Sequence, residues 1–323
     1  MPPHSRCERS RSRRNAVDEF ELIRRYFSRP TDSAAVVAGV GDDGAVLRPP
    51  AGRELVTVID TMVAGTHFPA DMSARDVGYR IVAVNLSDIA AMGATPLWMT
   101  LALTLVEADS DWLEEFAAGL FEAAAEWDVM LVGGDTTKGD QFVVSVQMSG
   151  HLAPGTALYR SGAKAGDTIF VTGTVGDAAA GLKQWSAGAG EPYLARRFAR
   201  PSARVGVGRA LAGIAHAAID LSDGLVADLS KILESSHVGA ELDLQRLPLS
   251  QELVETAGRE QALRHAMGGG DDYELCFTLP ESRLPADISA EVTPIGRITR
   301  EPGLVCRDGD SVVPFDNTGY RHF

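Results

Sequence analysis

The placement of aspartate constrains this chain more than any other feature of its sequence. Aspartates stand at the ends of apolar runs or beside glycine, in the segments GVGDDGAVL, LVTVIDT, NLSDIAAMGA, VMLVGGDTT, AIDLSDGL and GGGDDYELCF. Burying an unpaired carboxylate is far more costly than the gain from a few apolar neighbours. The fold must therefore bring these side chains to a compensating positive charge. Because the chain has only four lysines, divalent cations are the favoured partners, most naturally Mg²⁺ carrying a nucleotide phosphate.

Length and composition narrow the class of protein. A chain of 323 residues with 45% hydrophobic and 23% charged residues suits a globular protein of two domains. A net charge of −14 argues against a nucleic-acid partner. No apolar run approaches the length of a membrane-spanning helix, so no membrane partner is predicted. The three cysteines form no CxxC pair, which predicts neither a disulfide framework nor a zinc site and favours the cytoplasm.

The chain divides into three parts by its texture. Residues 1–15 form an arginine-rich extension that we expect to be disordered. An N-terminal α/β domain over 16–150 is predicted to bind metal and a nucleotide phosphate, and a glycine- and proline-rich stretch then opens a C-terminal α/β domain over 151–323. Periodicity predicts N-terminal helices over 18–27, 73–94 and 109–127 and strands over 34–40, 45–50, 54–60, 97–105, 128–135 and 142–150. In the C-terminal domain it predicts strands over 167–173, 217–220 and 272–279 alternating with helices over 176–185, 203–216 and 224–236.

Two glycine-containing turns invite a nucleotide-binding interpretation. Residues 39–44 match GxGxxG, but a dinucleotide-binding turn must open a helix, and Pro49 and Pro50 follow too soon for one. We expect this turn to present Asp43, together with Asp42, to a cation, with a solvated hairpin tip as the alternative. The chain has no Gly-Lys dipeptide and hence no Walker loop. The segment GGDTTKGD offers the carboxylate of Asp135 beside glycine amides, although an ordinary turn explains GGD nearly as well.

Four further aspartates have both a functional and a structural interpretation. Asp60 is predicted to mark the C-terminal end of a strand, where α/β sites form, or to cap the next element. Asp88 interrupts a helix that is apolar on nearly every face, so a metal site competes with a buried hydrogen-bonding role. Asp220 is predicted to end a strand. Asp223 is predicted to begin the following helix, where it could act only as an N-cap.

Three other polar residues are candidates of lower specificity. Ser222 could cap a helix or contact phosphate. His67 follows a tight turn and could face a ligand, although a lone histidine is more often structural. Arg160 has the right chemistry for phosphate, and an exposed linker arginine is the alternative.

Taken in order and spacing, these motifs resemble the bacterial thiamine-monophosphate kinase family, from about Glu19 to the C-terminus. NLSDIAAMGA, IDLSDGL and GGDDYELCF carry most of the specificity. The resemblance implies an α/β (α+β) two-domain fold of the aminoimidazole-ribonucleotide-synthetase type. The N-terminal sheets of two subunits would pair into a barrel in a homodimer, with ATP in a cleft beside the C-terminal α/β domain. The implied reaction transfers the γ-phosphoryl group of ATP to thiamine monophosphate, giving thiamine diphosphate and ADP, with several Mg²⁺ ions.

The resemblance also implies roles for individual residues. The positions that match the family's magnesium ligands are Asp43, Asp60, Asp88, Asp135, Asp220 and Asp223. The positions that match its ATP contacts are Gly134, Asp135, Arg160 and Ser222, and those near the thiamine substrate are His67, Asp271 and Tyr320. Two departures stand out. Val58 and Ile59 replace residues that commonly carry hydroxyls, and Asp271 replaces a commoner glutamate, which would shorten its reach.

Two alternatives remain open from the sequence. One is another ATP-using member of the same superfamily: the purine-pathway synthetase, selenophosphate synthetase or the hydrogenase-maturation protein. The last two are disfavoured because Cys7 lies among arginines and the chain ends Arg-His-Phe rather than in cysteine. The other alternative is a protein that binds metal or senses nucleotide without turnover.

Overall fold

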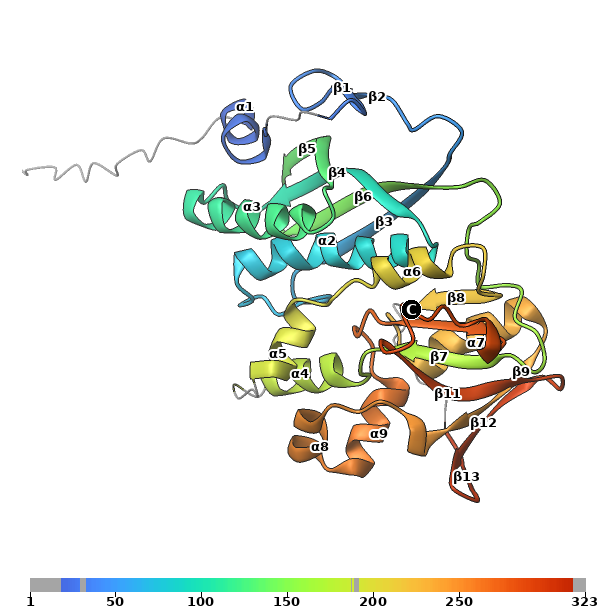
Figure 1. Ribbon diagram of the computed structural model, residues 1–323. Helices are drawn as coiled ribbons and strands as arrows, with labels where there is room; N and C mark the ends of the chain where they lie inside the picture. Colours follow the sequence, from blue (N-terminus) through green and yellow to red (C-terminus); the bar gives the residue numbers. More distant parts are fainter. Residues whose placement is uncertain (1–18, 30–32, 187, 189–191, 316–323) are drawn as a thin grey trace, which may run out of the picture.

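The N-terminal part of the protein is a four-stranded sheet with helices on one face (Figure 1). The computed structural model describes residues 19–29, 33–186, 188 and 192–315. The strand order is β3 (Glu54–Val63), β6 (Val143–Leu152), β4 (Thr95–Leu105) and β5 (Met130–Lys138). β6 pairs antiparallel with β3 and β4, whereas β4 and β5 are parallel. The outer strands of this sheet are therefore β3 and β5.

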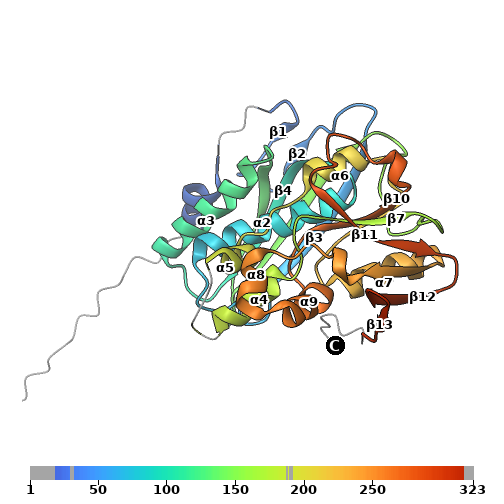
Figure 2. The same ribbon diagram turned by 60° about the horizontal axis from the view of Figure 1, so that its bottom comes forward.

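Helix α2 (Ala74–Ala91) is the central element of the molecule. It packs against the sheet and α3 (Ser110–Ala125) on one side and against α6 and β8 of the C-terminal part on the other (Figures 1 and 2). This position explains why a helix with so few polar positions forms here, since almost all of its faces are buried. Gly78 and Gly119 permit the close approach of α2 and α3, because a Cβ at either would meet backbone atoms of the other helix at 2.1 Å and 1.8 Å.

Both long N-terminal helices begin at a side-chain cap. The Oγ of Ser73 accepts a hydrogen bond from the amide of Asp76 at 3.1 Å and opens α2. The Asp109 side chain accepts hydrogen bonds from the amides of Asp111 and Trp112 at 3.0 and 2.9 Å and opens α3.

The segments before β3 form shorter elements than predicted. The expected helix over 18–27 is described as α1 (Glu19–Leu22) followed by a π-helical turn, η1 (Ile23–Phe27). The two expected strands around the GDDG turn reduce to β1 (Val36–Ala38) and β2 (Val46–Leu47), whose pairing shifts register between Val36 and Ala38. The turn between them is exposed at Asp42 and Asp43.

The C-terminal part is built on a second sheet, whose described residues form seven strands in the order β13-β12-β9-β11-β7-β10-β8. Its strands are β7 (Thr168–Thr172), β8 (Ala217–Asp220), β9 (Gly239–Asp243), β10 (Leu275–Leu279), β11 (Val292–Thr299), β12 (Gly303–Asp308) and β13 (Ser311–Val313). The predicted alternation of strands and helices is present. β10 nevertheless lies between β7 and β8, antiparallel to both, so the sheet is mixed and only β9 and β12 are parallel neighbours in its described residues.

The helices of this part are α4 (Asp177–Ser186), α5 (Pro192–Ala199), α6 (Val205–Leu211), α7 (Leu225–Ser236), α8 (Gln251–Ala257) and α9 (Arg259–Gly268), with short 3-10 turns η2 (Leu244–Arg246) and η3 (Glu281–Arg283). Figure 2 shows α8 and α9 beside α4. The helix predicted over 203–216 ends at Leu211, because Ala212 leaves helical geometry and Gly213 has φ +73°. The strand predicted over 272–279 begins only at Leu275. The loop before it places Asp271 and Tyr273 at positive φ, 71° and 52°.

The larger hydrophobic core joins the two parts of the chain. It includes residues of the N-terminal sheet, α2 and α3, and it continues to Phe170 and Phe277, which stack with ring centroids 5.3 Å apart in the C-terminal sheet. Cys276 is fully buried in a second core cluster, as a small apolar residue would be. Within the described ranges, no helix is long and apolar enough to cross a membrane.

Candidate active site

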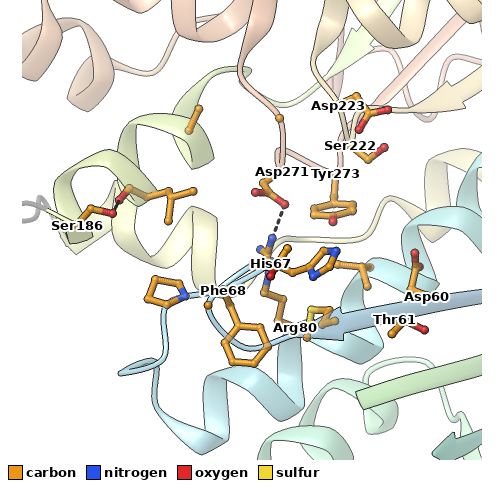
Figure 3. A pocket seen from close by; sticks show the side chains of 18 of the residues that line it. Asp60, Thr61, His67, Phe68, Arg80, Ser186, Ser222, Asp223, Asp271 and Tyr273 are labelled. Carbon is orange, nitrogen blue, oxygen red and sulfur yellow. Dashed lines mark hydrogen bonds and ion pairs between the residues drawn. The ribbon is translucent and has the colours of Figure 1, made fainter. Parts of the chain in front are cut away.

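A cavity of about 670 Å³ lies between the N- and C-terminal parts (Figure 3). The N-terminal part contributes the end of β3, the turn containing His67, and the Arg80 side chain of α2. The C-terminal part contributes α4, the loop with Ser222 and Asp223, and the loop with Asp271 and Tyr273. One inter-domain cavity therefore brings together five residues that were predicted from distant segments of the sequence: Asp60, His67, Ser222, Asp223 and Asp271.

Three carboxyl groups from three different elements lie close together beside the cavity, and Asp60 is the one of them that lines it. Asp60 lies on β3, Asp88 on α2 and Asp220 at the end of β8. Burial, repulsion from Asp220 and Asp60, and the hydrogen bond with Asp60 together raise the pKa of Asp88 to about 8. Burial also raises the pKa of Asp60. The pKa of Asp220 is raised to about 6, mainly by burial, although a 2.8 Å hydrogen bond from Ser87 Oγ lowers it in part. We call Asp60, Asp88 and Asp220 the acid cluster.

The positive groups near the acid cluster are few. Arg160 is exposed, yet it lies close enough to lower the pKa of Asp88. The ammonium of Lys231 contacts Asp223 Oδ2 at 2.6 Å and Asp228 Oδ1 at 2.8 Å. It is Asp228, rather than Asp223, that accepts the backbone amides of Asp223 and Gly224 before α7. Asp223 is therefore not an N-cap, and its carboxylate lines the cavity.

A second part of the cavity wall is formed around Asp271. Its carboxylate accepts a hydrogen bond from Arg80, whose side chain is buried (Figure 3). Phe68 and Tyr273 also line this part, as does His67, whose Nδ1 accepts the amide of Val63 at 3.1 Å. Aromatic faces beside a carboxylate suit a flat heteroaromatic ligand that carries a hydrogen-bond donor.

The carboxylates of the GGGDDYE motif have two different roles, holding the loop in place and lining the cavity. Asp272 accepts the amides of Gly176 and Ala178, at 2.6 and 3.1 Å, and so stabilises the start of α4. Glu274 is fully buried and pairs with Arg197 at 2.8 Å and Arg204 at 2.6 Å. These two side chains therefore hold the loop in place, and Asp271 is the carboxylate of the motif that lines the cavity.

A second cavity, of about 440 Å³, contains the remaining predicted residues. It is lined by the GVGDDG turn, with Asp42 and Asp43, and by Gly134 and Asp135 on β5. Gly134 cannot be replaced without movement, because a Cβ there would lie 1.9 Å from the carbonyl oxygen of Leu101. Gly134 is also exposed and lines this cavity, which suits the predicted contact with phosphate.

Within one chain the sheet separates the two sets of aspartates. Asp60 pairs with Val146, Val146 with Leu101 and Leu101 with Gly134, so Asp60 and Gly134 lie on one line across the sheet. Three strand spacings separate them, about 14 Å. Successive side chains of a strand point to opposite faces of a sheet. Asp60 therefore shares the helix-covered face with the buried Met62, whereas Asp135 lies on the open face beside the exposed Ala102. Asp43 and Asp135 therefore do not join the acid cluster in a single subunit.

The donor atoms of the acid cluster are suited to Mg²⁺. No group of three or more His, Cys, Asp or Glu side chains in the described part of the chain is arranged to hold a metal. Carboxylate oxygens with one or two protein ligands per ion, completed by phosphate and water, are the usual magnesium environment. The raised pKa values of Asp88 and Asp220 are those of carboxylates that lack a compensating charge. A divalent cation with its phosphate ligands fits this donor set.

The structure alters some predictions and adds residues that the sequence did not single out. Asp60 lies three residues before the end of β3 rather than at its end. Tyr320 falls outside the described residues. Sequence reasoning missed Arg80, although an arginine in the middle of the apolar run YRIVAV was a signal that could have been used. It also missed Lys231, because its position eight residues after Asp223 has meaning only once α7 is formed.

Comparison with known proteins assigns the architecture. Residues 41–152 match the AIR synthase related protein N-terminal domain, and residues 164–308 match the corresponding C-terminal domain. Together with the inter-domain cavity, these matches define a two-domain α/β protein of the AIR synthase related class.

The same comparison identifies the family within this class. The chain is 46% identical over 323 residues to the thiamine-monophosphate kinase of Escherichia coli K12, covering 95% of this chain and 99% of that protein. The crystal structure of thiamine-monophosphate kinase from Stenotrophomonas maltophilia has a TM-score of 0.82 at 43% identity, covering 90% of this chain and 96% of the other. AaThiL complexed with AMPPCP and TMP has a TM-score of 0.77 at 33% identity, covering 88% and 92%. The chain belongs to the thiamine-monophosphate kinase family.

Proposed function

We propose that this protein is a thiamine-monophosphate kinase, which transfers the γ-phosphoryl group of ATP to thiamine monophosphate and releases thiamine diphosphate and ADP. The observation that carries the proposal is the inter-domain cavity, which is lined by Asp60 of the acid cluster and by the aromatic groups around Asp271. A phosphorylated heteroaromatic substrate needs both kinds of group, carboxylates to hold cations for its phosphate and aromatic faces for its ring. A relative of the same family has been solved with an ATP analogue and TMP together.

The chemistry requires no general base. The second pKa of a phosphate monoester is about 6, so the acceptor oxygen is already ionised at neutral pH. The difficulty is electrostatic, because two unit charges about 4 Å apart repel by about 4 kcal/mol at an effective dielectric constant of about 20. Bound Mg²⁺ would cancel this repulsion and align the phosphates. We therefore propose direct in-line transfer without a phosphoenzyme; phosphate trapped on the protein, or retention at a chiral γ-phosphorus, would contradict it.

The proposed role of each residue follows from its position in or beside one of the two cavities. We propose that the acid cluster and Asp223 hold the cations that face the acceptor phosphate, and that Arg160 and Ser222 contact ATP. His67 and Asp271 line the inter-domain cavity, and we propose that they contact the thiamine ring together with Tyr320. Gly134, Asp135 and Asp43 would hold the nucleotide and its cations from the second cavity, through backbone amides and carboxylates.

A homodimer with paired N-terminal sheets would bring the two sets of aspartates together. β3 and β5 are the two edges of the sheet, and its open face exposes Leu55 and Ile59, which are 50% and 66% exposed. Exposed apolar side chains beside free strand edges favour pairing with a second sheet. If β3 of one subunit lies against β5 of its partner, the barrel closes and the two distant edges become neighbours. We propose that each active site combines Asp60 of one subunit with Asp135 of the other.

A cytoplasmic location is also part of the proposal. Cys276 and Cys306 are free and buried, in keeping with a reducing compartment.

The direct test uses purified protein with ATP, Mg²⁺ and thiamine monophosphate. We expect thiamine diphosphate, measured by chromatography, that disappears with EDTA and does not form when free thiamine is the acceptor. ATP binding without thiamine diphosphate would instead favour another superfamily activity or a nucleotide sensor.

Metal affinity should rise with pH. Mg²⁺ requires ionised carboxylates, whereas burial raises the pKa of Asp88 to about 8 and that of Asp220 to about 6 in the metal-free protein. Below pH 8, binding must displace the proton of Asp88, and below pH 6 that of Asp220 as well. The apparent affinity for Mg²⁺ should therefore increase up to tenfold per pH unit from 6 to 8 and level off above 8. Calorimetry in buffers of different ionisation enthalpy would measure the released proton, and a pH-independent affinity would remove Asp88 from the metal site.

A further inference from the structure

Arg80 is a buried cation placed directly behind the carboxylate of Asp271. Only 1% of its surface is exposed, and its guanidinium lies over the ring of Phe198 at 4.4 Å and that of Tyr273 at 5.5 Å. One terminal nitrogen donates to the carbonyl of Phe198 and the other to Asp271 Oδ1 (Figure 3). Its Nε–H donates to no acceptor among the described residues. A buried charge with an unfilled donor is costly, so the stability of the fold does not explain its position.

Backbone hydrogen bonds fix the loop that contains Asp271. The amide of Asp271 donates to the carbonyl of Ser222 at 2.9 Å, and that of Tyr273 donates to the carbonyl of Leu221 at 2.9 Å. Asp271 itself adopts φ +71°, a conformation that an aspartate keeps only where its surroundings require it. Because the loop cannot easily move toward a ligand, the reach of Asp271 depends on its side-chain torsions.

The side chain of Asp271 has one free oxygen. Oδ1 is occupied by Arg80, and Oδ2 accepts no hydrogen bond from any residue that the structure describes. The side chain is 30% exposed and lines the cavity. A carboxylate that is fixed through one oxygen offers the other as an acceptor in a defined direction. The matching ligand group is an N–H donor at the edge of a flat ring lying beside Tyr273, such as the amino group of an aminopyrimidine.

We propose that Arg80 is a positioning residue for the acceptor substrate: it locks the short Asp271 side chain so that Oδ2 accepts the amino group of the thiamine ring. The inference rests on the proposed kinase function and deepens it. In this arrangement the ion pair is neutral, so the site selects a ring with a suitably placed N–H rather than any cation. Aspartate is shorter than the glutamate common at this position. Fixing its side-chain torsion compensates, because Oδ2 is then held in the direction of the ligand.

The expected signature is a change in the KM for thiamine monophosphate alone. Arg80→Met should raise this KM about 10- to 100-fold, while kcat and the KM for ATP change less than about threefold. Arg80→Lys keeps the charge and should recover part of the loss. Arg264→Met is a matched control, since Arg264 is exposed and pairs only with Glu260 on the same helix among the described residues. A shift in the KM for ATP as large as that for thiamine monophosphate would overturn the assignment, as would an unchanged KM for thiamine monophosphate.

A double-mutant cycle separates positioning from general damage. If Arg80 acts through Asp271, Arg80→Met should add less than about twofold to the KM of an Asp271→Ala protein. Fully additive effects would overturn the proposal. The double variant also removes both charges, so it controls for misfolding caused by a lone buried charge, and circular dichroism with thermal melting would report the fold of each variant.

Failure of the kinase proposal can be distinguished from failure of this one. Absence of thiamine diphosphate with the wild-type protein counts against the kinase reaction alone. Calorimetric binding of thiamine monophosphate then tests Arg80 directly, with the same 10-fold loss in Arg80→Met expected. A wild-type protein that does not bind thiamine monophosphate, or a variant that binds it equally well, would overturn the role of Arg80.

Discussion

Replacing Asp88 by asparagine should lower kcat by roughly 10²–10³-fold or more while leaving the metal-free protein at least as stable as the wild type. Asp88 is isosteric with asparagine, so the packing of α2 is retained. Activity falls because an amide cannot supply the negative charge that holds a cation between two phosphates. Stability does not fall, because burial and repulsion from Asp220 and Asp60 already disfavour the carboxylate of Asp88.

The stability effect has a defined pH dependence. The folded-state pKa of Asp88 is raised to about 8, so its favourable contribution is present below the unfolded value of about 3.9 and is lost as the pH rises through 8. Asparagine does not ionise, and the variant should therefore gain melting temperature over the wild type at pH 9 and about half as much at pH 6.

Steady-state kinetics and thermal melting in EDTA would measure the two effects of Asp88→Asn. The exposed Asp287 offers a matched Asp→Asn control that should change neither. Activity within about threefold of the wild type would exclude Asp88 from the site, and lower stability at pH 9 would mean that its charge supports the fold.

Two inactive variants should restore activity when their subunits are mixed. Asp60→Asn and Asp135→Asn are each expected to be nearly inactive as homodimers. In a heterodimer built as proposed, one site carries both substitutions and the other carries neither. Random exchange makes about half of the dimers mixed, with one intact site in each, so activity should return to about one quarter of the wild type. The physical basis is the strand order, which places Asp60 and Asp135 on the two outer strands of one sheet, so that pairing with a second subunit is needed to make these strands neighbours.

A second pair of variants provides the control for subunit mixing. Asp60 and Asp88 share a hydrogen bond within one chain, so heterodimers of Asp60→Asn with Asp88→Asn contain no intact site and should stay inactive. The measurement is thiamine diphosphate formation after exchange, with size-exclusion chromatography to confirm dimers. If Asp60→Asn with Asp135→Asn gives no more activity than the separate proteins, each site lies within one subunit or does not use both residues.

Much of the local structure could be predicted because its causes are local. The apolar patterns over 73–94 and 109–127 predicted α2 and α3 within a few residues of their observed bounds. The predicted C-terminal strand over 272–279 was three residues too long at its start. Apolar pattern cannot reveal that Asp272 and Glu274 bond to α4 and to two arginines of other segments. Apolar periodicity also failed to predict α5, α8 and α9, because their apolar faces are short.

The sequence by itself determined that many aspartates had to find positive charge, since so few lysines are present and burial of an unpaired carboxylate is costly. Its motifs also indicated the family and the phosphoryl chemistry. Only the tertiary structure decided which carboxylates meet. Asp60, Asp88 and Asp220 converge because α2 is packed between two sheets, whereas Asp135 is kept apart by strand order and alternation. Arg80 likewise acquired a partner only when α2 brought it beneath Asp271. Ionic contacts between distant segments depend on the arrangement of whole elements, and no local pattern records that arrangement.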